Sequence, residues 1–383
     1  MAELSSARMT PRASTLVLIV LFGLFALLVA PSASFGQTVQ GRVLHLGPDT
    51  PVPGALVALV DAAGRDVARA VSSASGGFTL AAAQPGRYHV TVRQIGWRPW
   101  ESPAFELAAG TAHPLVLRID AEPYALPTIT VEAKRPRCGI RLGDDELVSR
   151  LLEVAQTALA LAQATADQGT LGFSSEWYLA RYTPDFQVTD SSSSGVGRLA
   201  SWPIQSAPPD TLARWGFVRT DGEGQAWTDV GADRGPVYFG LDARTLFSDW
   251  FLASHCFRLE DSALEELRVA FAPERRSDRV DVAGMLVLDR ASLELRRIGF
   301  EYVNLPRWIP RAVAGGEVRL RRLRSGAWVP YAWRVRAPVP RLEVGRPRPR
   351  LHSWVETGGW VRSVRGPAGV VDSALTREVL GVE

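Results

Sequence analysis

The residues most suggestive of chemistry are His255-Cys256-Phe257, where a thiol directly follows an imidazole. A thiolate activated by a neighbouring base is a common nucleophile. Adjacent side chains on an extended strand, however, point to opposite faces, so His255 is poorly placed to activate Cys256. An uncharacterised hydrolase that uses one of these two residues is therefore the least favoured of three functional hypotheses.

The only other cysteine in the chain is Cys138. An even cysteine count in an exported protein favours one disulfide, Cys138–Cys256, which would close a long loop and contribute roughly 4–5 kcal/mol in the chain-entropy model. Two buried thiols are the alternative. The sequence has no Cys-x-x-Cys, no clustered histidines, no Gly-x-Ser-x-Gly, no His-Glu-x-x-His and no phosphate loop. We therefore expect no metal, no cofactor and no catalytic site.

The first 36 residues have the pattern of a secretory signal peptide. Arg8 and Arg12 precede the apolar run Leu16–Ala30, and small residues follow it up to Gly36. This order favours cleavage after Gly36 over an uncleaved membrane anchor, because the run is short for a spanning helix. We expect an exported protein of the periplasm or outer membrane, with secretion as the alternative, and without a transmembrane helix in the mature chain. The formal net charge of +3 is too small to indicate nucleic acid.

Residues 37–120 carry short alternating runs separated by Gly/Pro turns, which is typical of a small β-sandwich. Its marks are Gly41-x-Val43, the segment Pro51–Val57, a Gly-x-Phe turn at Phe78, and the segment Pro85–Val92 followed by Ile95-Gly96-Trp97. These motifs resemble the carboxypeptidase regulatory-like domain. The resemblance implies a prealbumin-like or carbohydrate-binding-like sandwich of seven strands that is an accessory module and not a peptidase.

Residues 121–143 read as a linker. The segment Tyr124–Ala133 resembles the strand that joins such modules to the plug of TonB-dependent receptors, although too few residues follow it for a complete receptor. Basic residues around Cys138 form either a patch for anionic lipid or, as we prefer, a solvated linker. A second basic segment, Arg341–Arg350, forms either a contact with a membrane or a polyanion or, as we prefer, a solvated loop.

Residues 144–383 are predicted to form one helix followed by an antiparallel sheet. Apolar residues recur at helical spacing over Asp144–Ala166. Strands alternate from Phe173 onward, with a polar loop at Ser191–Gly195, a short helix over Asp242–Ser254, a β-bulge between Leu295 and Ile298, and a strand that ends at Pro338 and Pro340. The fold class is therefore mainly β: a sandwich, one amphipathic helix and a C-terminal meander.

The meander resembles the curved half-barrel of periplasmic lipoprotein carriers. The whole chain is also similar to secreted bacterial proteins that join a regulatory-like module to a His-Cys-Phe segment and a meander, a resemblance that implies no activity. The first hypothesis is thus a non-enzymatic envelope protein, with a binding or adaptor role toward an envelope protein, glycan or lipid. Its ligand face would carry Phe300, Tyr302, Val329, Tyr331 and Trp333, although the same residues could simply form the core.

The second hypothesis is a carbohydrate-binding or cell-surface attachment protein in which the sandwich binds the ligand. Exposed aromatic side chains are the usual platform for sugar rings, and the candidates on the sandwich are Trp97 and Trp100. The sequence does not decide between these two hypotheses.

Overall fold

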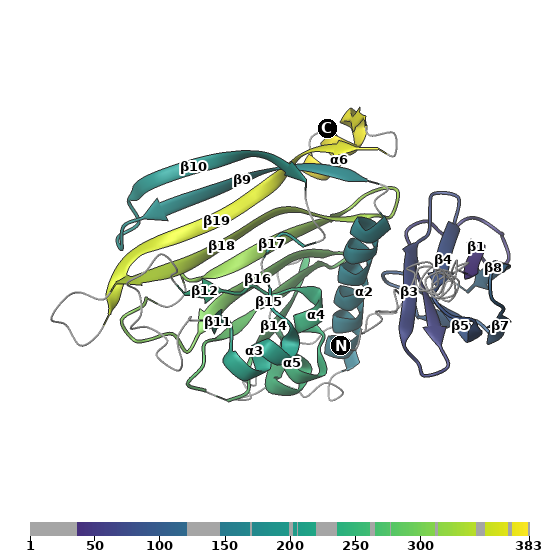
Figure 1. The fold of residues 1–383 in the computed structure, drawn as a ribbon, viewed down its shortest axis with the longest axis horizontal. Helices are drawn as coiled ribbons and strands as arrows, with labels where there is room; N and C mark the ends of the chain where they lie inside the picture. The colour runs from purple at the N-terminus through teal and green to yellow at the C-terminus, as the bar shows by residue number, and fades with distance from the viewer. Residues whose placement is uncertain are drawn as a thin grey trace, which may run out of the picture.

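The structure is a computed structural model that describes residues 37–120, 146–168, 171–198, 202–204, 206–219, 236–260, 265–275, 277–310, 313–341, 349–366 and 370–381. Two β modules lie side by side with a long helix between them (Figure 1). The mainly β prediction is confirmed. The signal peptide, the linker 121–143 with Cys138, and most of the basic segment after Arg341 lie outside the described residues.

The N-terminal module is a sandwich of two small sheets. One sheet has the order β4-β1-β8, and the other has the order β3-β2-β5-β6 with β7 paired to β5. The strands are β1 (Gln37–His45), β2 (Leu56–Asp61), β3 (Asp66–Val71), β4 (Gly77–Ala82), β5 (Gly86–Arg93), β6 (Trp100–Glu101), β7 (Phe105–Leu107) and β8 (Ala112–Ile119). The last strand, β8, runs parallel to β1, and the other pairings are antiparallel.

The sandwich core follows from alternation along its strands. On β5, Tyr88, Val90 and Val92 are buried in one cluster with side chains of the other sheet. The turns need backbone conformations that favour glycine: Gly54 and Gly76 have φ of +71° and +74°. Ser72 fixes the turn at Gly54, since its hydroxyl donates to Val52 O and accepts from Ala55 N.

The C-terminal module is built on a long antiparallel sheet of order β10-β9-β19-β18-β17-β16-β15-β14-β13, with β20 added to β19. Its strands are β9 (Gly172–Tyr182), β10 (Val188–Arg198), β13 (His255–Glu260), β14 (Glu266–Pro273), β15 (Asp281–Asp289), β16 (Leu295–Val303), β17 (Gly315–Arg322), β18 (Trp328–Arg341), β19 (Arg350–Arg365) and β20 (Val371–Asp372). A separate pair, β11 (Val218–Arg219) and β12 (Val237–Tyr238), lies beside this sheet.

One face of the long sheet, here the core face, carries large apolar side chains such as Phe257, Phe271, Ile298, Val318 and Trp333. Aromatic rings on this face cover glycines of the neighbouring strand, which lack a side chain of their own. A Cβ on Gly284 would lie 2.5 Å from the ring of Phe271, one on Gly316 would lie 2.6 Å from the ring of Phe300, and one on Gly359 would lie 2.6 Å from the ring of Trp333. The opposite side is called the outer face below.

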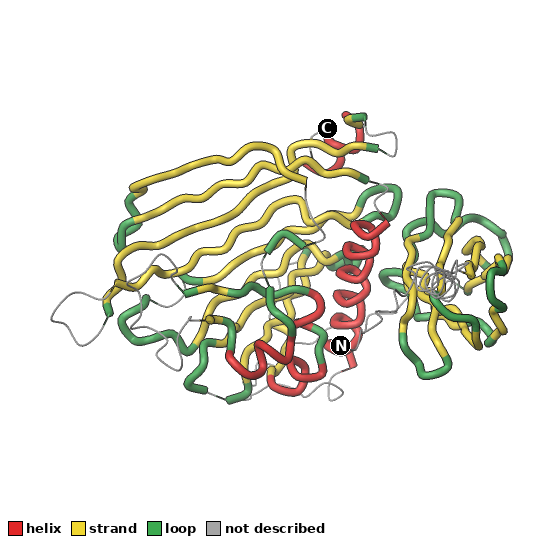
Figure 2. Tube along the Cα trace, viewed as in Figure 1, coloured by secondary structure: helices red, strands yellow, loops and turns green. Residues whose placement is uncertain are grey.

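Helix α2 (Glu146–Gln168) is the centre of the molecule and confirms the predicted helix with a shift of two residues at each end. It crosses the core face of the sheet and lies next to β3 of the sandwich (Figures 1 and 2). Its apolar residues share one cluster with the sheet and with Leu56 and Ile95 of the sandwich. A helix buried by partners on two sides has a wider apolar surface than a surface helix.

The exposed and half-exposed residues of the middle of α2 form one narrow polar stripe along Glu153, Gln156, Ala160 and Gln163. They are three or four residues apart and therefore lie on one side of the helix. The two β modules thus pack on the rest of the helix surface and leave this stripe uncovered.

The shorter helices are α3 (Pro209–Trp215), α4 (Ala243–Leu246), α5 (Asp249–Ser254) and α6 (Ser373–Leu380). The single helix predicted over 242–254 is two helices, because Ser248 accepts from Phe251 N and starts a new one. At the C-terminus, Val379 of α6 packs in a small cluster with Val329 and Val364.

Three further local predictions can be compared with the structure. The bulge is confirmed, since pairing shifts between Leu288–Leu295 and Val287–Arg297. The prediction of a polar loop at Ser191–Gly195 is wrong, because these residues belong to β10, an edge strand paired with β9. The predicted end of a strand at Pro338 and Pro340 is also wrong, because β18 continues to Arg341. It pairs with β17 only as far as Arg336, so later residues have a partner on one side, where a missing N–H is tolerated.

Candidate functional site

The five aromatic and aliphatic candidates of the sheet are mostly core residues and do not form an open face. Phe300, Tyr302 and Trp333 are buried in the main cluster beneath α2 and its neighbours. The Tyr302 hydroxyl donates to Phe239 O at 3.0 Å, so even its polar end is used inside the protein, and burial raises its pKa.

Val329 and Tyr331 do not share a face with Trp333, which corrects the sequence interpretation. Trp333 pairs with Val318 and Pro330 pairs with Leu320, so one extra residue lies between them on β18. This bulge moves Val329 into the small cluster with α6, whereas Tyr331 is half-buried against it and lies under the Arg321 guanidinium, 4.7 Å from the ring centroid.

His255 is a buried structural residue. Its Nδ1 lies 3.0 Å from Ser254 Oγ and 3.2 Å from Phe251 O, and its Nε2 lies 3.2 Å from Val282 O and 3.3 Å from Asp281 Oδ1. Its ring stacks on Phe251 with centroids 3.7 Å apart. Ser254, His255 and Asp281 are the residue types of a hydrolase triad, but the His255 side chain is 0% exposed, so no substrate reaches it.

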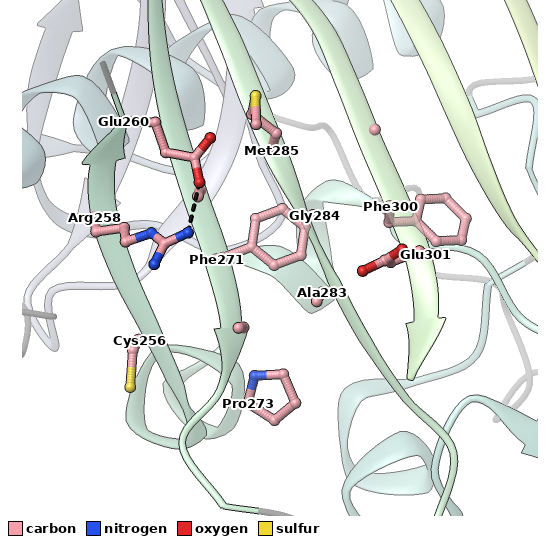
Figure 3. A pocket seen from close by; sticks show the side chains of 13 residues that line it. Cys256, Arg258, Glu260, Phe271, Pro273, Ala283, Gly284, Met285, Phe300 and Glu301 are labelled. Carbon is pink, nitrogen blue, oxygen red and sulfur yellow. Dashed lines mark hydrogen bonds and ion pairs between the residues drawn. The ribbon is translucent and has the colours of Figure 1, made fainter. Parts of the chain in front are cut away.

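Cys256 lies on the opposite side of β13 from His255, at the end of a shallow depression of about 500 Å³ on the outer face. Figure 3 shows Cys256, Arg258 and Glu260 in a row along β13, with Arg258 bonded to Glu260 at 2.6 Å. The neighbouring strands contribute small residues: Ala270, Ala272, Ala283 and Gly299. The described residues contain no free thiol. Because Cys138 lies outside the described residues, the Cys138–Cys256 bridge stays a prediction.

The outer face elsewhere is bridged by charge pairs between strands. Glu356 is buried and accepts from Arg336 at 2.8 Å and from the Tyr178 hydroxyl at 2.9 Å. Burial, and next the Glu356 charge, raise the pKa of Tyr178. Glu317 is held between Arg319 and Arg297, and these hydrogen bonds lower its pKa against the opposing effect of burial. These charged and hydroxyl side chains bond to one another, so this part of the outer face is a hydrogen-bonded network within the protein.

The two tryptophans predicted on the sandwich have different surroundings. Both Trp97 and Trp100 are half-buried and pack against the sandwich core. Trp97 lies at a hollow of about 280 Å³ between the sandwich and α2, and its ring meets that of His45 at 4.9 Å between centroids. Only Trp97 is therefore placed at a cavity shared by both modules.

A second hollow of about 500 Å³ continues from the first along α2. Arg93 and Gln156 line both, so the two form one cleft between the modules. One wall is the outward side of β2, β5 and β6, on which Leu56, Thr91, Arg93 and Glu101 stand in register. The other wall is the polar stripe of α2. This inter-module cleft is the candidate binding site.

Most residues of this cleft are not recognisable as site residues from the sequence. Thr91 and Arg93 were recognisable as the residues of β5 that face away from the sandwich core, but nothing in the sequence places that side against α2. The cleft brings together aromatic rings, guanidinium groups, carboxylates and amides, which can bind a ligand by hydrogen bonds and stacking. Within the described part of the chain, no three possible metal ligands cluster, and no helix is long and apolar enough to cross a membrane.

Fold and cleft together define a two-module protein, in which a small sandwich is docked through one helix onto a curved antiparallel sheet. Residues 38–120 match the family model of the carboxypeptidase regulatory-like domain. This confirms the resemblance drawn from the motifs, and it concerns the sandwich alone. A search of curated proteins found no match.

Two solved structures illustrate how far structural similarity extends. A 5-hydroxyisourate hydrolase from Klebsiella pneumoniae is 21% identical, with 21% of this chain and 90% of the other covered and a TM-score of 0.18. A minor pilin from Streptococcus agalactiae is 13% identical, with 25% of this chain and 48% of the other covered and a TM-score of 0.19. Similarities this low support no conclusion about function.

Proposed function

We propose that the protein is a non-enzymatic binding or adaptor protein of the cell envelope, exported by residues 1–36 to the periplasm or outer membrane. The observation that supports this most is the position of α2, which is buried by the sheet on one side and contacts the sandwich on the other. The accessory module is thereby docked onto the second module, and the cleft lies at their junction. The burial of His255 disfavours the hydrolase alternative.

The partner is an envelope protein, a glycan or a lipid, and native mass spectrometry can separate these. The mature chain is purified from its own envelope in mild detergent, and the spectrum is compared with that of chain refolded from denaturant. We expect an additional mass on the native sample alone: a small one for a lipid or glycan, a large one for a protein. Identical bare masses in both samples would contradict a binding role.

The carbohydrate-binding alternative is favoured by one specific observation. Trp97, one of the two tryptophans proposed as sugar platforms, packs against the sandwich core on one side and also lines the polar cleft. A glycan-binding role would use the cleft between the modules and not the sandwich alone. A glycan-sized mass on the native protein, lost in Trp97→Ala, is the expected result for this alternative.

A further inference from the structure

The inter-module cleft contains polar atoms that the protein itself leaves without partners. The Oγ1 of Thr91 and the Oε1 of Gln94 are buried, and neither has a hydrogen-bond partner among the described residues. Thr91 is only 6% exposed and yet lines the hollow beside Trp97. Buried polar atoms are nearly always paired in folded proteins. Two unpaired atoms on neighbouring residues that line one cavity therefore point to a ligand that supplies the missing bonds.

Other side chains of the cleft add to the groups that can bond to this ligand. The Arg93 side chain makes no ion pair or hydrogen bond with any described residue, although other arginines of the sandwich, such as Arg65 and Arg69, have carboxylate partners. It stands beside both hollows. Glu101, which lies opposite Thr91 on β6, is exposed, and so is Gln156 on α2. The cleft thus offers donors and acceptors on both walls within one cavity.

The ring of Trp97 provides an apolar surface at the same place. The ring is half-buried: it packs against the sandwich core and meets the ring of His45. A ligand that satisfies all these groups needs many hydroxyls, each able to donate and accept, and an apolar C–H surface for the ring. A simple anion would leave Glu101 and Gln94 Oε1 without donors, and a lipid tail would leave every polar group unpaired.

We propose that the inter-module cleft binds a saccharide, with one sugar ring against Trp97 and its hydroxyls bonded to Thr91, Gln94 and Arg93. The inference rests on the proposed binding role and gives it a ligand class. The first hollow, at about 280 Å³, is close to the lower end of the roughly 300–1,000 Å³ that ligand pockets occupy. The second hollow continues along the polar stripe of α2, so an oligosaccharide of a few units fits the cleft better than a single sugar.

Isothermal titration of the mature chain with four defined trisaccharides tests this. The probes are maltotriose, cellotriose, the N-acetylglucosamine trimer and trigalacturonic acid. We expect at least one to bind, and Thr91→Val and Trp97→Ala each to weaken it about tenfold or more. Thr91→Ser, which keeps the hydroxyl, should retain binding. Two controls outside the cleft should leave it unchanged: Thr79→Val on β4 and Arg87→Gln on β5.

Thermal unfolding of the same variants tests the proposed cleft without a ligand. Removing an unpaired hydroxyl from a strand should leave the melting temperature of Thr91→Val unchanged or raise it. A marked decrease would mean that the hydroxyl has a structural partner, and would overturn the inference. Binding that persists in both Thr91→Val and Trp97→Ala would also overturn it. If none of the four probes binds at millimolar concentration, the saccharide class is wrong, whereas the proposed envelope role is judged separately by native mass spectrometry.

Discussion

Replacing Gly326 with alanine should separate the two modules. Gly326 is in the turn between β17 and β18 and has a φ of +87°, and Gly54 of the sandwich lies directly against it. A Cβ on Gly326 would lie 2.6 Å from the Gly54 nitrogen and still closer to its Cα. Both neighbours are backbone, so neither can move aside as a flexible side chain would.

The expected loss in the free energy of unfolding has two parts. An alanine in the left-handed region costs about 1–2 kcal/mol by itself. Relieving the backbone overlap requires the sandwich to move away from the sheet, which exposes Leu56 and Ile95 at the α2 contact, and full exposure of one such side chain costs roughly 1.5–3 kcal/mol. Gly326→Ala should therefore lower the free energy of unfolding by about 2.5–5 kcal/mol if the equivalent of one such side chain becomes exposed.

Gly64→Ala is the matched control. Gly64 has a φ of +77° in a sandwich turn, and nothing lies within 4 Å of its Cβ position. It should show the conformational cost alone, about 1–2 kcal/mol. In calorimetry, Gly326→Ala should also split the unfolding transition into two, one for each module, whereas Gly64→Ala should not. Equal losses of stability together with one transition in both variants would refute the idea that this contact joins the modules.

Three further predictions follow from the core, the cysteines and a turn. Trp333→Ala should cost about 3–5 kcal/mol in urea unfolding, because the ring is buried over a glycine; a folded variant of unchanged stability would contradict a core role. The denatured mature protein should gain about 2 Da on reduction if Cys138 and Cys256 are bridged, and no shift would exclude the bridge. Backbone hydrogen bonding from Ser292 lowers the pKa of Asp289. The stabilisation of the fold by the Asp289 carboxylate is therefore present above its unfolded pKa and lost as pH falls through its folded pKa. Asp289→Asn should destabilise the protein at pH 7 but not at strongly acidic pH, and an equal loss of stability at both would refute this.

Local patterns predicted the elements of this fold better than their contacts. The alternation on β5, the helical period of α2 and the bulge near Leu295 are properties of neighbouring residues, and all three are present. The serine run of β10 was wrongly predicted to be a loop, because an edge strand with an exposed side needs no alternation of apolar residues.

The site could not be read from the sequence for a different reason. Thr91 and Gln156 are 65 positions apart, and they meet only because the sandwich docks on α2. That docking depends on tertiary packing at Leu56, Ile95 and Gly54, and none of these residues has a local signature of an interface. Similarly, the shift of Val329 away from Trp333 depends on one extra residue in β18 whose register is set by β17.

The parallel pairing of β1 with β8 determines how the sandwich responds to mechanical force. The chain enters at the start of β1 and leaves at the end of β8, and the two strands run side by side in the same direction from Thr38–Ala112 to His45–Ile119. Tension applied between residues 37 and 120 therefore pulls these strands in opposite directions along their length. The evenly spaced hydrogen bonds of a parallel pair then bear the load together as shear, instead of opening one after another. A module connected in this way withstands pulling along the chain far better than a hairpin of the same size.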